Sequence, residues 1–155
     1  KQKTAYEIPK RDWSSDVCSS DLAKKYLWIQ IFLNANSDPY IRFNSDSGST
    51  YSARTSSNGG TDSLDTLSIH TQMGSFFGGT NTGFGNMFII NTASKEKLGI
   101  VHGVQNNTNG AGNAPARREG CFKWANTSNQ ITSIQITKGT MTLKAGTTIK
   151  VWGSD

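Results

Sequence analysis

The sequence predicts an all-β protein, an antiparallel β-sandwich of jelly-roll type, from its composition and its hydrophobic pattern. Ser, Thr, Gly and Asn together make up 64 of the 155 residues, and Glu occurs only three times. Such a composition is typical of short strands joined by polar turns, and it lacks the blocks of Ala, Leu, Glu and Lys that build helical bundles. About nine short segments alternate or run apolar without a helical pattern between them. Because parallel sheets need crossover connections, the sheets should be mainly antiparallel, and a closed barrel is the alternative architecture.

The first strong strand is expected at residues 26–33, where apolar residues occupy both faces. Its odd positions, from Leu27 to Leu33, share one face, and Tyr26, Trp28 and Phe32 share the other. A strand that is apolar on both faces belongs in the middle of a sheet. Further strands are expected at 40–43, 51–54, 67–72, 87–91, 97–104, 121–125, 131–136, 141–144 and 148–152.

Polar and glycine-rich segments between these strands predict turns and loops. The longest are residues 74–85, which hold five glycines, and residues 105–118, which are rich in Asn, Gly and Ala. The last three strands are expected to form a meander, because short Gly-containing turns separate them. In the final strand, Ile149 and Val151 should face the core, and Trp152 should lie on the opposite face, covered by a neighbouring strand or subunit.

Residues 11–22 read RDWSSDVCSSDL and resemble the in-frame translation of a short-read sequencing adapter over twelve consecutive residues. The alternative is a polar loop with two Ser-Ser-Asp turns. We therefore expect residues 1–22 to be a non-native N-terminal segment and residues 23–155 to form a single β-sandwich domain. Cys18 falls within the adapter-like segment and Cys121 stands alone, so no disulfide framework is predicted.

The candidate catalytic and metal-binding residues have simpler structural explanations. His70 and His102 lie in predicted strands and are too few for an all-histidine metal site. The segment Asn44-x-Asp46-x-Gly48 offers oxygen ligands for calcium but lacks the closing Glu of an EF-hand loop, and turn capping is the favoured role. Predicted strand interiors hold almost no carboxylates, so no glycosidase pair is expected. We expect no catalytic residue, no cofactor and no metal, and the sequence assigns no ligand-binding residue.

Charge and hydropathy disfavour two classes of partner. The formal net charge is +5, and residues 23–155 alone also carry +5, but the basic residues of that segment are scattered, with tight pairs only at 24–25 and 117–118. A solvated β surface explains this better than a nucleic-acid site. No apolar run reaches the ~18 residues of a membrane span. We therefore expect neither nucleic acid nor membrane as a partner.

The region from 42 to 52 is expected to form a tight connection between two strands. Arg42 and Asp46 are close enough in sequence to pair, and Asp46 can cap the turn by accepting backbone N–H groups. Phe43 and Tyr51 flank the turn and would pin it to the core.

Three segments resemble a family of small phage structural proteins. Residues 25–29, KYLWI, resemble the family's opening strand, and residues 42–52, RFNSDSGSTYS, are similar to its central signature. Residues 131–134 followed by 146–153, GTTIKVWG, resemble its C-terminal pair of strands. The chain departs from the pattern with Ser45 in place of glycine and Trp152 in place of tyrosine. The resemblance implies a jelly-roll sandwich attached to virions and supplies no catalytic residue.

The resemblance implies a virion structural or accessory protein, in the tail or on the head surface, that acts by assembly without catalysis. Its expected partners are other virion proteins and further copies of itself, as a homo-oligomer in a virion made in the bacterial host cytoplasm. The alternative is a carbohydrate-binding module, such as the receptor-binding tip of a tail, that binds a host-surface glycan through loops 74–85 and 105–118. Trp28, Trp124 and Trp152 could stack on sugar rings, although packing is the favoured role for all three.

Overall fold

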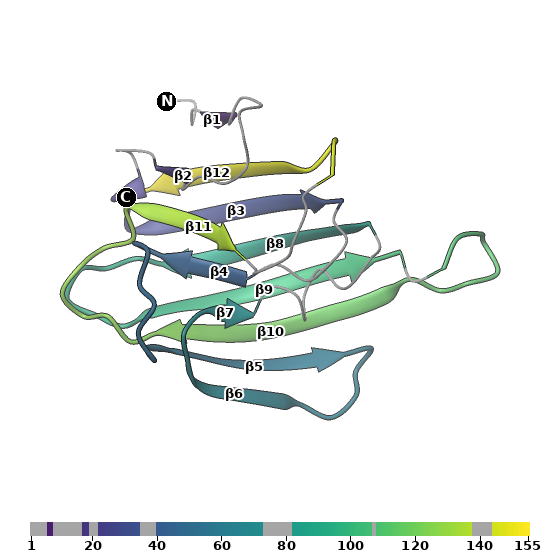
Figure 1. Cartoon of the computed structure of the whole chain (residues 1–155), viewed down its shortest axis with the longest axis horizontal. Helices are drawn as coiled ribbons and strands as arrows, with labels where there is room; N and C mark the ends of the chain where they lie inside the picture. Colours follow the sequence, from purple (N-terminus) through teal and green to yellow (C-terminus); the bar gives the residue numbers. More distant parts are fainter. Residues whose placement is uncertain are drawn as a thin grey trace.

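The computed structural model describes residues 6–7, 17–18, 22–34, 40–72, 82–106, 108–137 and 144–155. These residues form strands and turns without an α-helix, and their strands pair antiparallel in two sheets (Figure 1). The predicted all-β antiparallel sandwich is therefore confirmed. No helix in the described ranges has the length and apolar character needed to cross a membrane.

The large sheet has eight strands in the order β1-β12-β3-β8-β9-β10-β5-β6. Their bounds are β1 (Tyr6–Glu7), β12 (Thr148–Ser154), β3 (Tyr26–Leu33), β8 (Gly83–Ile90), β9 (Lys97–Gln105), β10 (Ala116–Trp124), β5 (Tyr51–Ser57) and β6 (Ser63–Ser68). The small sheet has the order β2-β11-β4-β7, with β2 (Val17–Cys18), β11 (Ser133–Thr137), β4 (Tyr40–Phe43) and β7 (Thr71–Gln72). Without the three two-residue strands, nine described strands remain in sheets of seven and two.

The chain passes repeatedly from one sheet to the other, as in jelly rolls. It leaves the large sheet after β3, β6 and β10 and returns at β5, β8 and β12 (Figure 1). The predicted C-terminal meander is consequently wrong, because β11 pairs with β4 in the small sheet whereas β12 pairs with β3 in the large one. Alternating apolar residues show that a strand is half-buried, but they do not identify its neighbour. The predicted strand at 141–144 falls almost entirely outside the described residues.

The core lies between the facing sides of the two sheets. Leu27, Ile29, Ile31 and Leu33 of β3 point into it, as their odd spacing predicts, and none is more than 2% exposed. Ile149 and Val151 of β12 are buried as expected. The other core residues are Leu22, Ile41, Phe43, Tyr51, Ala53, Met87, Ile89, Val101, Phe122, Trp124, Ile131 and Ile134.

An aromatic cluster fills the part of the core beneath β9 and β10. The ring of Phe43 lies 5.7 Å from that of Trp124 and 5.8 Å from that of Phe122, measured between centroids. Gly99 on β9 makes room for this cluster, since a Cβ there would overlap the ring of Phe122. Tyr51 completes the cluster, with its ring 6.3 Å from that of Trp124.

Several strand boundaries differ from the predicted ones for local reasons. β3 and β4 have the predicted bounds. β8 begins earlier than predicted, at Gly83, because Gly83 and Gly85 pair with both β3 and β9 as regular strand residues. The predicted strand at 67–72 is broken into the end of β6 and β7. Leu67 has a φ of 54° and is 77% exposed, because it lies in a bulge of β6 between the paired residues Asp65 and Ser68. The chain leaves the large sheet after Ser68.

The N-terminal residues that the structure describes contact the sandwich at its edges. β1 pairs with β12 and β2 pairs with β11. Leu22, the last residue of the adapter-like segment, is 4% exposed and belongs to the core. The amide of Asn91 donates a hydrogen bond of 3.1 Å to the carbonyl of Leu22. The packed unit therefore includes residue 22.

Candidate interaction face

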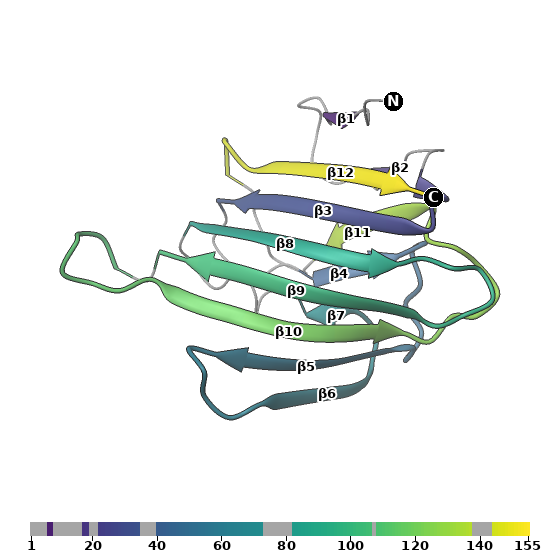
Figure 2. The same cartoon turned by 180° about the vertical axis from the view of Figure 1, so that it is seen from behind.

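The face of the large sheet that points away from the small sheet is called here the outer face, and Figure 2 views it from the front. It consists mainly of alternate residues of β12, β3, β8, β9 and β10. Nine large apolar side chains on its three central strands remain between 37% and 54% exposed. They are Tyr26, Trp28, Phe32, Phe84, Phe88, Ile90, Leu98, Ile100 and Val104.

Strand register arranges these side chains in rows that run across the sheet. Each row is named here after its residue on β3, and its members on β8 and β9 are the cross-strand partners. The Tyr26 row continues with Ile90 and Leu98, the Trp28 row with Phe88 and Ile100, the Gln30 row with Asn86 and His102, and the Phe32 row with Phe84 and Val104. The outer face is therefore apolar in three rows and polar in one.

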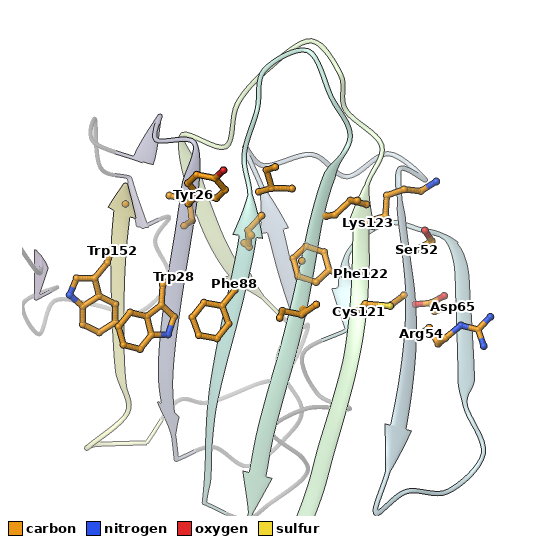
Figure 3. A pocket seen from close by; sticks show the side chains of 18 of the residues that line it. Tyr26, Trp28, Ser52, Arg54, Asp65, Phe88, Cys121, Phe122, Lys123 and Trp152 are labelled. Atoms are coloured by element: carbon orange, nitrogen blue, oxygen red, sulfur yellow. The ribbon is translucent and has the colours of Figure 1, made fainter. Parts of the chain in front are cut away.

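The Trp28 row forms a stack of aromatic rings (Figure 3). The ring of Trp28 is 4.4 Å from that of Trp152 and 5.7 Å from that of Phe88 between centroids, with interplanar angles of 24° and 11°. Near-parallel rings at these distances overlap in an offset stack. The indole N–H of Trp28 also donates a 2.9 Å hydrogen bond to the side-chain oxygen of Asn86, which fixes the ring.

This stacking affects how the outer face could contact a sugar or another protein. A sugar ring binds an aromatic side chain by lying on the face of its ring, and the faces of Trp28 are partly occupied by its own neighbours. The ring edges and the aliphatic side chains of Ile90 and Ile100 remain open. Apolar surface of this kind is best covered by another apolar protein surface.

The Tyr26 and Trp28 rows line a broad hollow of about 1160 Å³. Its far rim is polar, with Arg54, Asp65 and Lys123 on the strands beyond β9 (Figure 3). Cys121 is exposed on β10 and opens into the same hollow. The rim charges are partly paired within the chain, since Arg54 contacts Asp62 at 2.9 Å and Lys123 contacts Glu96 at 3.3 Å. The hollow is thus an apolar floor with a charged border, the anatomy of a protein interface.

The Gln30 row extends across five strands as a polar stripe. Lys150 on β12 pairs in register with Gln30, and Glu119 on β10 pairs with His102. The carboxylate of Glu119 lies 3.3 Å from the guanidinium of Arg117. Glu119 is the sole carboxylate of these five strands, and the row continues beyond Lys150 to Glu7 of β1, which pairs with Lys150 in register. Five strand spacings of about 4.8 Å separate β1 from β10, so the row does not hold the two facing carboxyl groups of a glycosidase.

Of the two loops expected to bind a glycan, the structure describes most of loop 105–118 but little of loop 74–85. Loop 105–118 connects β9 to β10, and its described part meets the Phe32 row at a hollow of about 390 Å³. Two of its side-chain amides bond within the loop: Asn106 donates to the side-chain oxygen of Asn109 at 2.7 Å, and Asn113 donates to the backbone carbonyl of Asn109 at 3.0 Å. Most of loop 74–85 lies outside the described residues, and its last three residues belong to β8.

The three tryptophans singled out for sugar stacking do not act as one group. Trp28 and Trp152 lie on the outer face, whereas Trp124 is fully buried on the inner face. The indole N–H of Trp124 donates a 2.7 Å hydrogen bond to a carboxylate oxygen of Asp46. Trp124 therefore packs in the core, and its predicted packing role is confirmed.

Asp46 caps the β4–β5 turn and is not an open metal ligand. Its Oδ1 accepts the backbone N–H of Gly48 at 2.8 Å, and its Oδ2 accepts the Thr50 hydroxyl at 2.8 Å as well as the Trp124 N–H. Burial by itself raises the pKa of Asp46, but the bonds from Trp124, Gly48 and Thr50, with the charge of Arg42, lower it overall.

The rest of this turn departs from the predicted ion pair. The Arg42 guanidinium donates to the carbonyl of Ile69 at 3.1 Å, and Arg42 acts on Asp46 through its charge. The hydroxyl of Tyr51 accepts the backbone N–H of Phe43 at 2.9 Å, which ties the two flanking aromatic residues together. Burial raises the pKa of Tyr51, which remains a neutral hydroxyl.

The two histidines lie apart from one another. His70 packs against Tyr40, with ring centroids 3.7 Å apart, and burial together with the charge of Arg42 lowers its pKa. His102 is exposed in the Gln30 row. Within the described ranges no three His, Cys, Asp or Glu side chains converge on a metal-sized space.

Sequence reasoning missed a buried cation at the start of β9. Lys97 is fully buried, and its ammonium donates to the carbonyls of Lys95 at 2.9 Å and Asn126 at 2.6 Å. Burial lowers its pKa. Residues 97, 99 and 101 alternate along β9 and therefore point to the same, inner face. This alternation is the signal that could have revealed the burial of Lys97. Lys97 joins two connections at one end of the sandwich.

Comparison with known proteins adds no assignment. No protein-family model, curated protein or solved structure matches the chain. The function must therefore be argued from the outer face and from the residues themselves.

Proposed function

We propose that this protein is a virion structural or accessory protein, from a phage tail or head surface, that works by assembly without catalysis. Two independent lines support the proposal. One is the resemblance of residues 25–29, 42–52 and the C-terminal segments to small phage structural proteins. The other is the apolar outer face, which no described element of the chain covers.

The observation that carries the proposal is the outer face. Soluble monomers rarely expose contiguous apolar patches larger than a few hundred Å². Here three of the four rows on the central strands are apolar, and their nine side chains are 37–54% exposed. Removing apolar surface from water is favourable, so a protein partner that covers this face would be stabilised in the complex. Assembly is the function that uses such a face directly.

The same face offers little for catalysis. Bond cleavage by general acid–base chemistry needs at least two titratable groups placed around a substrate. In the Gln30 row, His102 and Glu119 are cross-strand partners, and Glu119 is held by Arg117. The other described members across these five strands are Lys150 on β12, three strands away from His102, and Gln30 and Asn86, whose amides donate and accept hydrogen bonds without exchanging protons at ordinary pH.

A carbohydrate-binding module is the second candidate, and one observation favours it. The Phe32 row meets the amides of Asn106, Asn109 and Asn113 in the hollow beside loop 105–118. Aromatic rings beside amides are a common arrangement in sugar sites, where rings stack and amides bond hydroxyl groups. However, the mutual bonding of these amides leaves fewer donors for a sugar.

Two measurements test the proposed function. Tail or capsid genes beside this gene on its source contig would support a virion role, whereas polysaccharide-utilisation genes would contradict it. Mass spectrometry of density-purified virus particles from the same source provides the direct test. Peptides from residues 23–155 should co-purify with the particles, and their recovery only in the soluble fraction would contradict the proposal. A glycan array of the purified protein tests the alternative separately.

A further inference from the structure

We infer that the outer face binds a second copy of this chain, sheet against sheet, about a two-fold axis that runs along β8. This inference deepens the proposed function and rests on it, since it names the first partner in assembly. Three properties of the face lead to it: the apolar area, the order of the rows, and the charges at the ends of the polar row.

The exposed apolar area matches what a stable dimer needs. A side chain of ~200 Å² that is two-fifths exposed offers ~80 Å² to a partner, so nine such side chains offer roughly 700 Å². Stable protein interfaces bury about 800 Å² on each partner. The half-buried Trp152 and the polar row supply the remainder. The area of this face is therefore sufficient for a stable interface with one second copy.

The order of the rows allows each row to meet the same row of the second copy under this symmetry. Rotation by a half-turn about an axis parallel to β8 keeps each row at its own height and reverses the order of strands. Trp28 on β3 then lies over Ile100 on β9 of the other copy, and Tyr26 lies over Leu98. Phe88 and Ile90, both on β8, meet their own symmetry mates. Every apolar row thus covers an apolar row, and aligned sheets pack in this way in β-sandwiches.

The polar row is compatible with the same axis. Lys150 and Glu119 lie two strands away from β8 on opposite sides of the Gln30 row, which continues beyond Lys150 to Glu7 of β1. The half-turn places Lys150 of one copy over Glu119 of the other, twice in each dimer. Asn86, at the middle of the row, meets its own mate and can exchange amide hydrogen bonds with it. A shift by one row would bury the polar stripe against aromatic rings, so the row pattern specifies the alignment.

A charge at the axis tests the inference most simply. Phe88→Asp would place two carboxylates against each other in the dimer, while Phe88 is 46% exposed in the single chain and tolerates a polar side chain. Sedimentation equilibrium should give a dimer for the parent protein and a dissociation constant raised by about 100-fold or more in the variant. Ser94→Asp, on the exposed β8–β9 turn, is the matched control and should remain dimeric. Ile90→Lys, which also meets its own mate, should repeat the effect with the opposite charge.

A charge swap tests the orientation. Lys150→Glu and Glu119→Lys should each weaken the dimer, and the double variant should restore it, because the pair reforms with reversed signs. Thermal melts of all variants show whether each chain still folds. A trimer, or a dimer that Phe88→Asp leaves intact, would overturn the inference, as would two single variants that the swap fails to rescue.

The inference and the proposed function can fail separately. A folded parent protein that stays monomeric at high concentration but co-purifies with virus particles overturns the second copy and keeps the virion role. A monomer that binds glycans on an array and is absent from particles overturns both.

Discussion

Met87 and Phe88 are neighbours on β8, yet Met87 is fully buried and Phe88 is 46% exposed. The same contrast runs along β3, where Ile29 is buried beside the exposed ring of Trp28. The inner face of the large sheet is covered by the small sheet, whereas the outer face is nearly as apolar and none of the described elements covers it. Amino-acid type alone therefore does not distinguish the face that is buried in the core from the face that is exposed. The predictions below separate the two faces, from the largest expected effect to the smallest.

Removal of β12 should have the largest effect. Deleting residues 147–155 removes Ile149 and Val151 from the core and exposes the edge of β3. Each buried apolar side chain contributes roughly 1.5–3 kcal/mol, and domains of this size are stable by only about 5–15 kcal/mol. The deleted chain should show no cooperative thermal transition. Trp152→Ala, which changes only the outer face, is the control and should still unfold cooperatively. A truncated chain that melts near the parent temperature would contradict the account.

Single truncations on β8 should separate the two faces more sharply. Met87→Ala leaves a cavity in the core and should lower the free energy of unfolding by about 2–5 kcal/mol. Phe88→Ala removes a half-exposed ring one residue away and should cost less than about 1 kcal/mol in the monomer. Chemical denaturation at low protein concentration measures both. Equal losses would mean that the outer face stabilises the single chain as much as the inner face does.

The turn beneath the core should give an intermediate effect that depends on pH. Asp46→Ala leaves the N–H of Trp124 and that of Gly48 without their acceptor, which should cost about 1–3 kcal/mol. Because the pKa of Asp46 is lowered by folding, its contribution is present above pH ~4 and is lost as the pH falls through its folded pKa.

Denaturation at pH 7 and in the acid range measures this effect. The difference between parent and variant should be largest at neutral pH and shrink on acidification. Asp62→Ala removes an exposed partner of Arg54 and serves as the control, with a loss near zero. A difference that stays constant down to pH 2 would show that the ionised carboxylate is not the stabilising form.

The N-terminal segment should have the smallest effect. If residues 11–22 derive from an adapter, deleting residues 1–21 should change the free energy of unfolding by less than about 1 kcal/mol, because β1 and β2 each add two residues to a sheet edge. Extending the deletion to Leu22 should cost about 1.5–3 kcal/mol more, since this side chain is buried. Thermal melts of both deletions measure the step. A large loss from the shorter deletion would contradict the adapter interpretation.

The fold class and the central strand could be predicted because they depend on local alternation. Residues 26–33 alternate, and the structure places them in the middle of the large sheet, between β12 and β8. The pairing of β11 with β4 could not be predicted, since period-2 alternation does not name a partner. The bulge at Leu67 could not be predicted for a related reason, because its positive φ occurs at a residue that alternates with Ile69 as in a regular strand.

The candidate site was predictable only in part. Alternation along the predicted strand at 97–104 places Leu98, Ile100 and Val104 on one face, but it does not show whether another element covers that face. That distinction depends on which side of the large sheet the small sheet covers, a tertiary property with no local signal. Trp124 and Trp28 illustrate the point, because both lie in apolar strands and only Trp124 reaches the core.

The reactivity of Cys121 tests the central claim most directly, because this thiol is exposed on the outer face beside the Trp28 row. In a Cys18→Ser background, the rate at which a maleimide alkylates Cys121 should be measured as the protein concentration rises. The account predicts a rate that falls several-fold as association covers the face, and that stays high at every concentration in Phe88→Asp. A parent rate independent of concentration, up to the highest at which the protein is soluble, would contradict the claim that the outer face is the assembly surface.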